Sequence, residues 1–106
     1  MNETIERRNS RRFQIALPLL LRWTDTEDHV DVGHSVNISH GGIFVLAANS
    51  PSVGTGVEVE FVLPASDFVP RPTRLQCVGR VTRVEIHSGF KGFAVAGRFL
   101  NESTEI

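Results

Sequence analysis

A chain of 106 residues is long enough for one domain with a modest core, and its 41% hydrophobic and 22% charged residues exclude wholesale disorder. The formal net charge of -1 argues against a general nucleic-acid-binding protein, because such proteins are basic overall. The single cysteine excludes an internal disulfide, and no apolar run reaches the roughly 18 residues of a membrane helix, so we expect a cytoplasmic protein without membrane insertion.

The chain begins with a basic segment. Residues 1–12 hold four arginines against two glutamates. Because like charges repel and the segment has little apolar surface to bury, we expect a flexible basic arm. The folded body then spans 13–100, and 101–106 form a short C-terminal tail. A basic arm on a near-neutral body favours a small anionic ligand over a long polyanion such as DNA.

The body contains six segments in which apolar and polar residues alternate with the two-residue period of β-strands. These segments are 13–23, 30–38, 43–46, 57–63, 75–84 and 93–99. Turn-forming residues separate them, and no window shows the 3.6-residue period of a helix. The pattern predicts an all-β fold, a six-stranded antiparallel β-barrel with little or no helix, because closure hides the edges that an open sheet exposes.

Alternation also predicts which residues face the core. We expect odd-numbered residues to face inward in 13–23, 57–63, 75–81 and 93–99. Pro18 lacks a backbone donor, which predicts that its strand lies at an edge or bends there. The alternation slips at Arg83-Val84, which predicts a β-bulge.

The second segment, 30–38, has one apolar and one polar side. Its apolar residues are expected to face the core: Val30, Val32, His34, Val36 and Ile38. Its polar residues are expected to face solvent: Asp31, Gly33, Ser35, Asn37 and Ser39. Asn37 and Ser39 should therefore point outward from the same face of the strand.

An arginine pair stands in the arm. Arg8 and Arg12 are four residues apart, so in an irregular arm they can clamp one anion from two sides. Each guanidinium can make two charge-assisted hydrogen bonds to a phosphate, and arginine also reads O6 and N7 of guanine. Alone, an Arg-x-x-x-Arg pattern arises often by chance, and a solvated basic leader explains it more simply.

A second polar group follows in Asn37-Ile38-Ser39-His40-Gly41-Gly42. Asn37 offers both donors and an acceptor, and Ser39 offers a small hydroxyl. Gly42 permits a backbone conformation, or a close ligand approach, that a side chain would block. Taken alone, a serine-glycine turn that closes a hairpin is the simpler interpretation, and His40 is then a turn histidine.

The two groups together are far more specific than either alone, and here the sequence resembles the PilZ domain family. The family signature is Arg-x-x-x-Arg followed roughly 20–30 residues later by Asp/Asn-x-Ser-x-x-Gly, which is the order and spacing of Arg12 and Asn37. The resemblance covers nearly the whole chain, including the late segments 78–81 and 92–99. It implies a six-stranded β-barrel of PilZ type that binds the bacterial second messenger cyclic di-GMP.

By this resemblance, Arg8 and Arg12 match the arginines that grip phosphates and guanine edges. Arg7 precedes the pair, and in the family an arginine there accompanies an intercalated ligand dimer, which implies two ligands per domain. Arg11 is an additional arginine within the motif whose role stays open. On binding a doubly anionic dinucleotide, the arm should fold against the barrel and change the surface that a partner meets.

The resemblance also assigns the second motif. Asn37, Ser39 and Gly42 match the residues that contact a guanine and its surroundings, and we include Gly41 in the predicted site. No cofactor is implied beyond the ligand itself. The downstream partner and its process are not indicated by the sequence.

Enzymatic interpretations have little support in the residues. The four histidines show no close metal-ligand spacing, and Cys77 has no nearby thiol partner. Ser39 and His40 are consecutive residues at a strand end and point apart, so they do not form part of a triad. We therefore predict no catalytic residue and no metal site.

Two alternatives to a cyclic di-GMP receptor stay open. The first is a PilZ-like protein-interaction module that binds no nucleotide, as in family members that lack the arginine motif. The second is a small barrel with a basic arm that binds single-stranded nucleic acid. The presence of both motifs argues against the first, and the net charge of -1 argues against the second.

Overall fold

The computed structural model describes residues 12–66, 70–87 and 89–101, and every regular element within these ranges is a β-strand. The strands are β1 (Arg12–Phe13), β2 (Pro18–Thr24), β3 (Asp28–Ser39), β4 (Gly42–Ala47), β5 (Gly56–Leu63), β6 (Thr73–His87) and β7 (Phe90–Asn101). The predicted all-β fold is confirmed. The predicted arm, 1–12, and tail, 101–106, lie outside the described residues except at Arg12 and Asn101.

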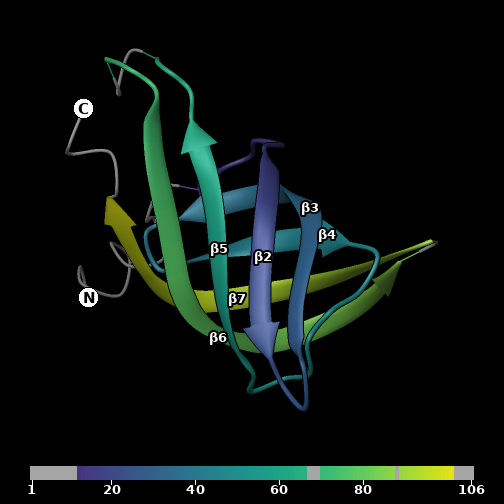
Figure 1. Ribbon diagram of the computed structural model, residues 1–106. Helices are drawn as coiled ribbons and strands as arrows, with labels where there is room; N and C mark the ends of the chain where they lie inside the picture. Colours follow the sequence, from purple (N-terminus) through teal and green to yellow (C-terminus); the bar gives the residue numbers. More distant parts are fainter. Residues whose placement is uncertain (1–11, 67–69, 88, 102–106) are drawn as a thin grey trace, which may run out of the picture.

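Strands β2 to β7 close into the predicted six-stranded antiparallel barrel (Figure 1). The order around the barrel is β3-β2-β5-β6-β7-β4, and pairing of β4 with β3 completes the ring. Figure 1 shows the long strands β6 and β7 curving beneath the others and extending into a hairpin. Closure gives each barrel strand a neighbour on both sides, which an open sheet cannot provide for its edge strands.

The first predicted strand, 13–23, is divided in two by a bend. β1 ends at Phe13 and β2 begins at Pro18, and the two strands pair with different parts of β3. Pro18 stands at the first position of β2, where its missing N–H leaves the ladder intact. The break that Pro18 predicted is therefore present, immediately before it.

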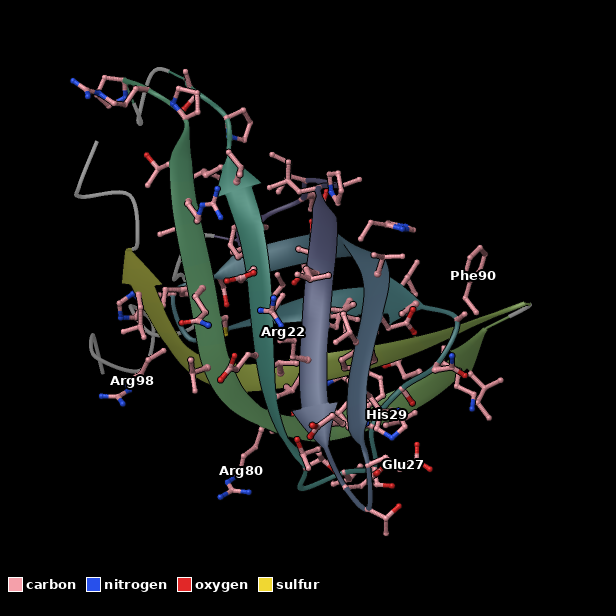
Figure 2. All side chains as sticks on the ribbon, viewed as in Figure 1. Arg22, Glu27, His29, Arg80, Phe90 and Arg98 are labelled. Atoms are coloured by element: carbon pink, nitrogen blue, oxygen red, sulfur yellow. The ribbon has the colours of Figure 1, made fainter. Side chains whose placement is uncertain are left out.

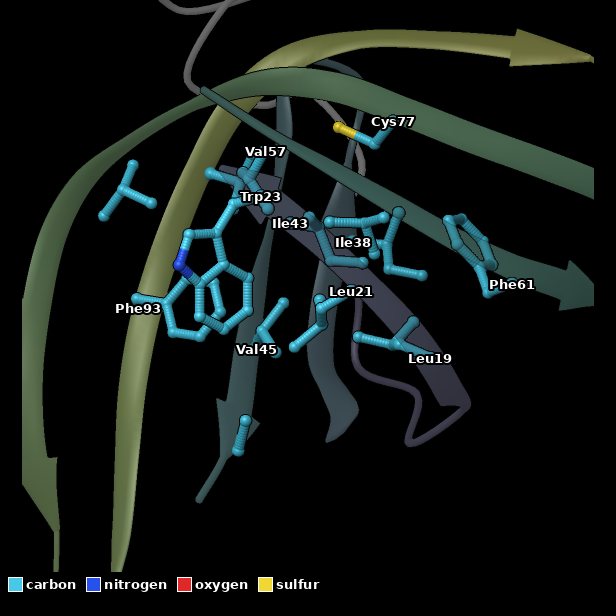
Figure 3. Packing of buried hydrophobic residues seen from close by; sticks show 14 of the residues in the cluster. Leu19, Leu21, Trp23, Ile38, Ile43, Val45, Val57, Phe61, Cys77 and Phe93 are labelled. Carbon is cyan, nitrogen blue, oxygen red and sulfur yellow. The ribbon is translucent and has the colours of Figure 1, made fainter. Parts of the chain in front are cut away.

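The core is filled from alternate strand positions, as Figure 3 shows for side chains that converge from several strands. Its buried apolar residues are Leu17, Leu19, Leu21, Trp23, Ile38, Ile43, Val45, Ala47, Val57, Val59, Phe61, Cys77, Val81, Phe93 and Val95. Odd-numbered residues fill the interior from β2, β5, β6 and β7, which confirms the inner faces predicted for these strands. Burial of this continuous apolar surface is the main stabilising contribution to the fold.

The predicted faces of β3 are wrong in the first half of the strand. Val30 and Val32 are 65% and 66% exposed, whereas Ser35 is fully buried. The register with β4 shifts between Ser35 and Asn37, so Val36 is the extra residue of a β-bulge. The bulge reverses the alternation, and Ile38 is buried as predicted. Apolar character does not indicate burial before the bulge, because the extra residue exchanges the inward and outward positions of the strand.

Ser35 holds the bend between β1 and β2. Its Oγ accepts a hydrogen bond from the Leu17 N–H at 2.9 Å and donates one to the Ile15 carbonyl. The Ser35 N–H also donates to the Leu17 carbonyl at 3.0 Å. These bonds satisfy backbone groups that the bend removes from the ladder, and they fix the chain against β3 where β1 begins.

Candidate functional site

The backbone of Arg12 lies opposite that of Ser39. β1 pairs antiparallel with the end of β3, which places Arg12 against Ser39 and Phe13 against Ile38. The end of the arginine motif and the second motif, which are far apart in sequence, therefore meet at one end of β3. The predicted site residues Arg7 and Arg8 lie outside the described residues.

Two rows of residues cross the outer surface beside this meeting point. Strand register gives the rows as Asn37–Phe44–Ala94–Arg83 and Ser39–Gly42–Ala96–Arg80. Residues directly opposite each other in antiparallel strands share a face of the sheet, so each row brings together β3, β4, β7 and β6. Figure 2 shows Arg80, at the end of the second row, pointing away from the barrel.

A shallow depression of about 370 Å³ lies over these rows, except at Arg80, which does not line it. Gly42, Ala94 and Ala96 contribute almost no side-chain bulk to its floor. Residues of β3 border one end and Thr82 and Arg83 of β6 border the other. All four predicted residues of the second motif line this depression: Asn37, Ser39, Gly41 and Gly42.

Asn37 and Ser39 offer polar groups that the folded barrel does not use. Both residues are partly exposed, and no described residue forms a hydrogen bond with either side chain. The amide of Asn37 can donate and accept, and the hydroxyl of Ser39 can do the same. This end of the depression is therefore suited to a polar ligand with both donors and acceptors.

The two glycines of the motif differ in their surroundings. A Cβ on Gly42 would lie 2.3 Å from the Val95 carbonyl oxygen, so β4 can approach β7 only with glycine there. Gly42 does not have a positive φ, and the close approach is made by β7. A Cβ on Gly41 would meet nothing within 4 Å, and the Gly41 carbonyl accepts a hydrogen bond from the Gly97 N–H at 3.1 Å.

Sequence reasoning missed Phe44 and Arg83, which strand register places in one cross-strand row with Asn37, Phe44 next to it and Arg83 at the far end. The only signal was the slip of alternation at Arg83-Val84, and the bulge that it predicted is confirmed between Val81 and Arg83. Val81 faces the core. Without the extra residue, Arg83 would share that inward direction, so the bulge is what turns Arg83 to the outer surface.

A larger groove of about 840 Å³ surrounds the β2–β3 hairpin, but its cations already have partners. Arg22 Nη1 lies 3.2 Å from Glu60 Oε1, and Arg80 Nη1 donates to the Gly54 carbonyl at 2.9 Å. Figure 2 shows Arg22 and Arg80 on this side of the barrel. Because both arginines are already paired, the groove is poorly suited to binding an anion.

The hairpin next to this groove is held by a stacked ring pair. The rings of Trp23 and His29 have centroids 4.9 Å apart, and His29 Nε2 lies 3.0 Å from Asp25 Oδ1. The hydrogen bond from the Glu27 backbone N–H, together with that from His29, lowers the pKa of the Asp25 carboxyl. Trp23 does not line the smaller depression.

The described part of the chain offers little support for a metal site or a reactive thiol. No cluster of three or more histidine, cysteine or acidic residues could hold a metal ion there. Cys77 is buried, and burial raises the pKa of its thiol to about 11. No helix in the described ranges is long and apolar enough to cross a membrane.

Comparison with known proteins gives one family. The family model described as the PilZ domain matches residues 6–105, nearly the whole chain. The comparison with curated proteins gives no match.

Proposed function

The chain belongs to the PilZ domain family, and we propose that it is a receptor for cyclic di-GMP that binds the dinucleotide in the depression beside Asn37 and Ser39. PilZ domains are in general cyclic di-GMP receptors and are not a catalytic family. We further propose that the protein acts in the bacterial cytoplasm as an adaptor without enzymatic activity. Its response to the ligand is passed to a protein partner.

One observation carries this proposal. The backbone pairing of Arg12 with Ser39 brings the end of the arginine motif to the rim of the depression that the second motif lines. A clamp made of two sequence motifs requires that they be neighbours in space. Support comes from β1, which adds to β3 and brings the backbone of Arg12 beside Ser39.

The proposed roles follow from the chemistry of each group. Arg8 and Arg12 bind the phosphates and guanine edges, because a guanidinium forms paired charge-assisted hydrogen bonds with both. Asn37 and Ser39 hydrogen-bond to one guanine, and the small floor at Gly41 and Gly42 leaves room for the flat base. Arg7 contributes to a second, intercalated cyclic di-GMP.

Ligand binding is also proposed to order the arm. The two phosphates neutralise the clustered arginines, and the bases offer flat surfaces on which the arm can fold. The partner then meets a surface made jointly of arm, ligand and barrel. Hydrogen exchange of the backbone amides in 5–12 should slow when cyclic di-GMP is added, and unchanged exchange in the presence of bound ligand would contradict this part of the proposal.

Calorimetric titration tests the binding itself. Cyclic di-GMP, its linear dinucleotide and a single-stranded oligonucleotide should be titrated into the same protein, and only the first should bind tightly, with a molar ratio near one or two. Calorimetry is preferable to intrinsic fluorescence, because Trp23 lies away from the depression.

The outcomes separate the candidate functions. Tighter binding of the oligonucleotide would identify a single-strand-binding barrel, and a lack of heat with all three ligands would leave a protein-interaction module. The exposed residues do not favour binding of a single-stranded polynucleotide. In the described ranges, Phe90 is the only aromatic residue among the exposed large apolar side chains, whereas single-strand binders use several aromatic platforms.

A further inference from the structure

Arg83 lies over the ring of Phe44 at the end of the depression opposite the second motif. Its guanidinium carbon is 5.5 Å from the centroid of the Phe44 ring, within the range of a cation–π contact. Phe44 belongs to the same cross-strand row as Asn37. Ala94 stands between Phe44 and Arg83 in that row, and its short side chain lets the arginine reach across β7.

Glu85 fixes the orientation of this guanidinium. Arg83 Nε donates to Glu85 Oε2 at 2.8 Å, which engages one edge of the arginine fork. No described residue accepts a hydrogen bond from the terminal nitrogens of Arg83. The side chain is 60% exposed, so these two nitrogens are available to a ligand. Glu85 and the Phe44 ring thus position the guanidinium, while its two terminal nitrogens have no partner among the described residues.

Stability does not explain this arrangement well. An ion pair between exposed side chains typically contributes about 0–1 kcal/mol, and the side chain of Arg83 is 60% exposed. The bulge between Val81 and Arg83 interrupts the β6–β7 ladder, and as a result this side chain points outward. Bulges commonly occur where a strand re-aims a side chain toward a site.

We propose that Arg83 is a specificity-determining residue that reads the O6 and N7 edge of a guanine lying on the floor formed by Gly42, Ala94 and Ala96. Two parallel donors on a planar fork match the two acceptors of that edge, which adenine does not present. This inference rests on the proposed function and deepens it, because it adds a base-reading group from β6 that neither sequence motif contains.

Three variants test the role of Arg83 in cyclic di-GMP titrations. Arg83→Ala removes the contact, and Arg83→Lys keeps the charge but loses the planar fork. Arg74→Ala is the matched control, because Arg74 is an exposed arginine near the other end of the same strand and does not line the depression. We expect both Arg83 variants to bind roughly five- to hundredfold more weakly than the parent chain, and Arg74→Ala to bind unchanged.

An altered ligand locates the contact. A 7-deaza analogue of cyclic di-GMP, in which N7 of each guanine is replaced by a carbon, should bind the parent chain more weakly than cyclic di-GMP does. Arg83→Ala should lose less affinity for the analogue than the parent chain does, because one arginine partner of N7 is already gone. Thermal unfolding of each variant shows that the barrel is intact.

The possible failures are distinguishable. If the parent chain does not bind cyclic di-GMP, the proposed function fails and this inference fails with it. If the parent chain binds but Arg83→Ala binds equally well, only the inference on Arg83 is overturned. Full retention of affinity in Arg83→Lys, or an equal penalty for the analogue in the parent and Arg83→Ala, overturns base reading in the same way.

Discussion

Arg12 and Ser39 are backbone partners in the short ladder between β1 and β3, so one strand spacing, about 4.8 Å, separates the end of the arm from the second motif. The bulge at Val36 decides which side chains of β3 face outward beside this pairing. Without the bulge, residues 35, 37 and 39 would share one face of β3. With it, Ser35 points inward to hold the bend before β2, while Asn37 and Ser39 point outward. One extra residue thus allows the same strand to anchor the arm and to present the candidate site.

Replacing Arg12 with alanine should weaken cyclic di-GMP binding by roughly 1.5–3 kcal/mol, because charge-assisted hydrogen bonds to phosphate would be lost. Arg8→Ala should have a similar effect, and Ser39→Ala a smaller one, since a neutral hydrogen bond contributes roughly 0.5–1.5 kcal/mol. Isothermal titration calorimetry measures all three, with Arg74→Ala as the control for loss of charge alone. Unchanged affinity in Arg12→Ala would contradict the clamp.

Gly42→Ala should destabilise the barrel, whereas Gly41→Ala should not. The added Cβ at Gly42 would lie 2.3 Å from a backbone oxygen of β7, and the strands must shift to relieve this contact. Overpacking of this kind typically costs roughly 1–3 kcal/mol. The added Cβ at Gly41 meets nothing within 4 Å, so its effect should stay within about 0.5 kcal/mol. Urea unfolding of the two variants makes the comparison, and equal stabilities would contradict the packing role of Gly42.

Ser35→Ala should lower the free energy of unfolding by roughly 1–3 kcal/mol. The change would remove the Oγ that bonds to the Leu17 N–H and to the Ile15 carbonyl, and it would leave a buried backbone donor without that partner. Ser52→Ala is a suitable control, because Ser52 is exposed in the loop before β5. Denaturant unfolding monitored by Trp23 emission measures both variants. A Ser35→Ala chain as stable as the Ser52→Ala chain would show that the bend does not need this hydroxyl.

Cys77 should resist thiol reagents in the folded protein. Its side chain is fully buried, and burial raises the pKa of the thiol from 9.0 to about 11, so at pH 8 the reactive thiolate is scarce and covered. An aromatic disulfide reagent should label the native chain slowly at pH 8 and the urea-unfolded chain quickly. Fast labelling of the native chain would contradict the burial of Cys77.

The same thiol gives a pH dependence of stability. As pH rises from about 9 to about 11, the unfolded thiol loses its proton while the folded thiol keeps it, so the unfolded state binds fewer protons and stability falls with increasing pH. Cys77→Ala should lower the free energy of unfolding at every pH through lost packing. The thiol's contribution to the change of that free energy with pH should be absent from this variant. An identical slope in the parent chain and Cys77→Ala would show that the thiol does not contribute.

The sequence by itself determined the all-β barrel and most of its core. Alternation with a two-residue period requires one face of each strand to be buried, and this local rule placed Leu21, Val59 and Phe93 correctly in the interior. The order of the two motifs along the chain also sufficed to identify the family. These features depend on residues near one another in sequence, which is why a pattern can carry them.

Only the tertiary structure decided which residues share the candidate site. Strand register, which no local pattern encodes, places Arg12 against Ser39 and aligns Asn37 with Phe44 and Arg83. The two bulges reverse the alternation of β3 and β6, so the same period that predicted the core gave the wrong face for Val30 and Val32. A single added residue moves every following side chain to the opposite face, and its effect becomes visible only when the partner strands are in place.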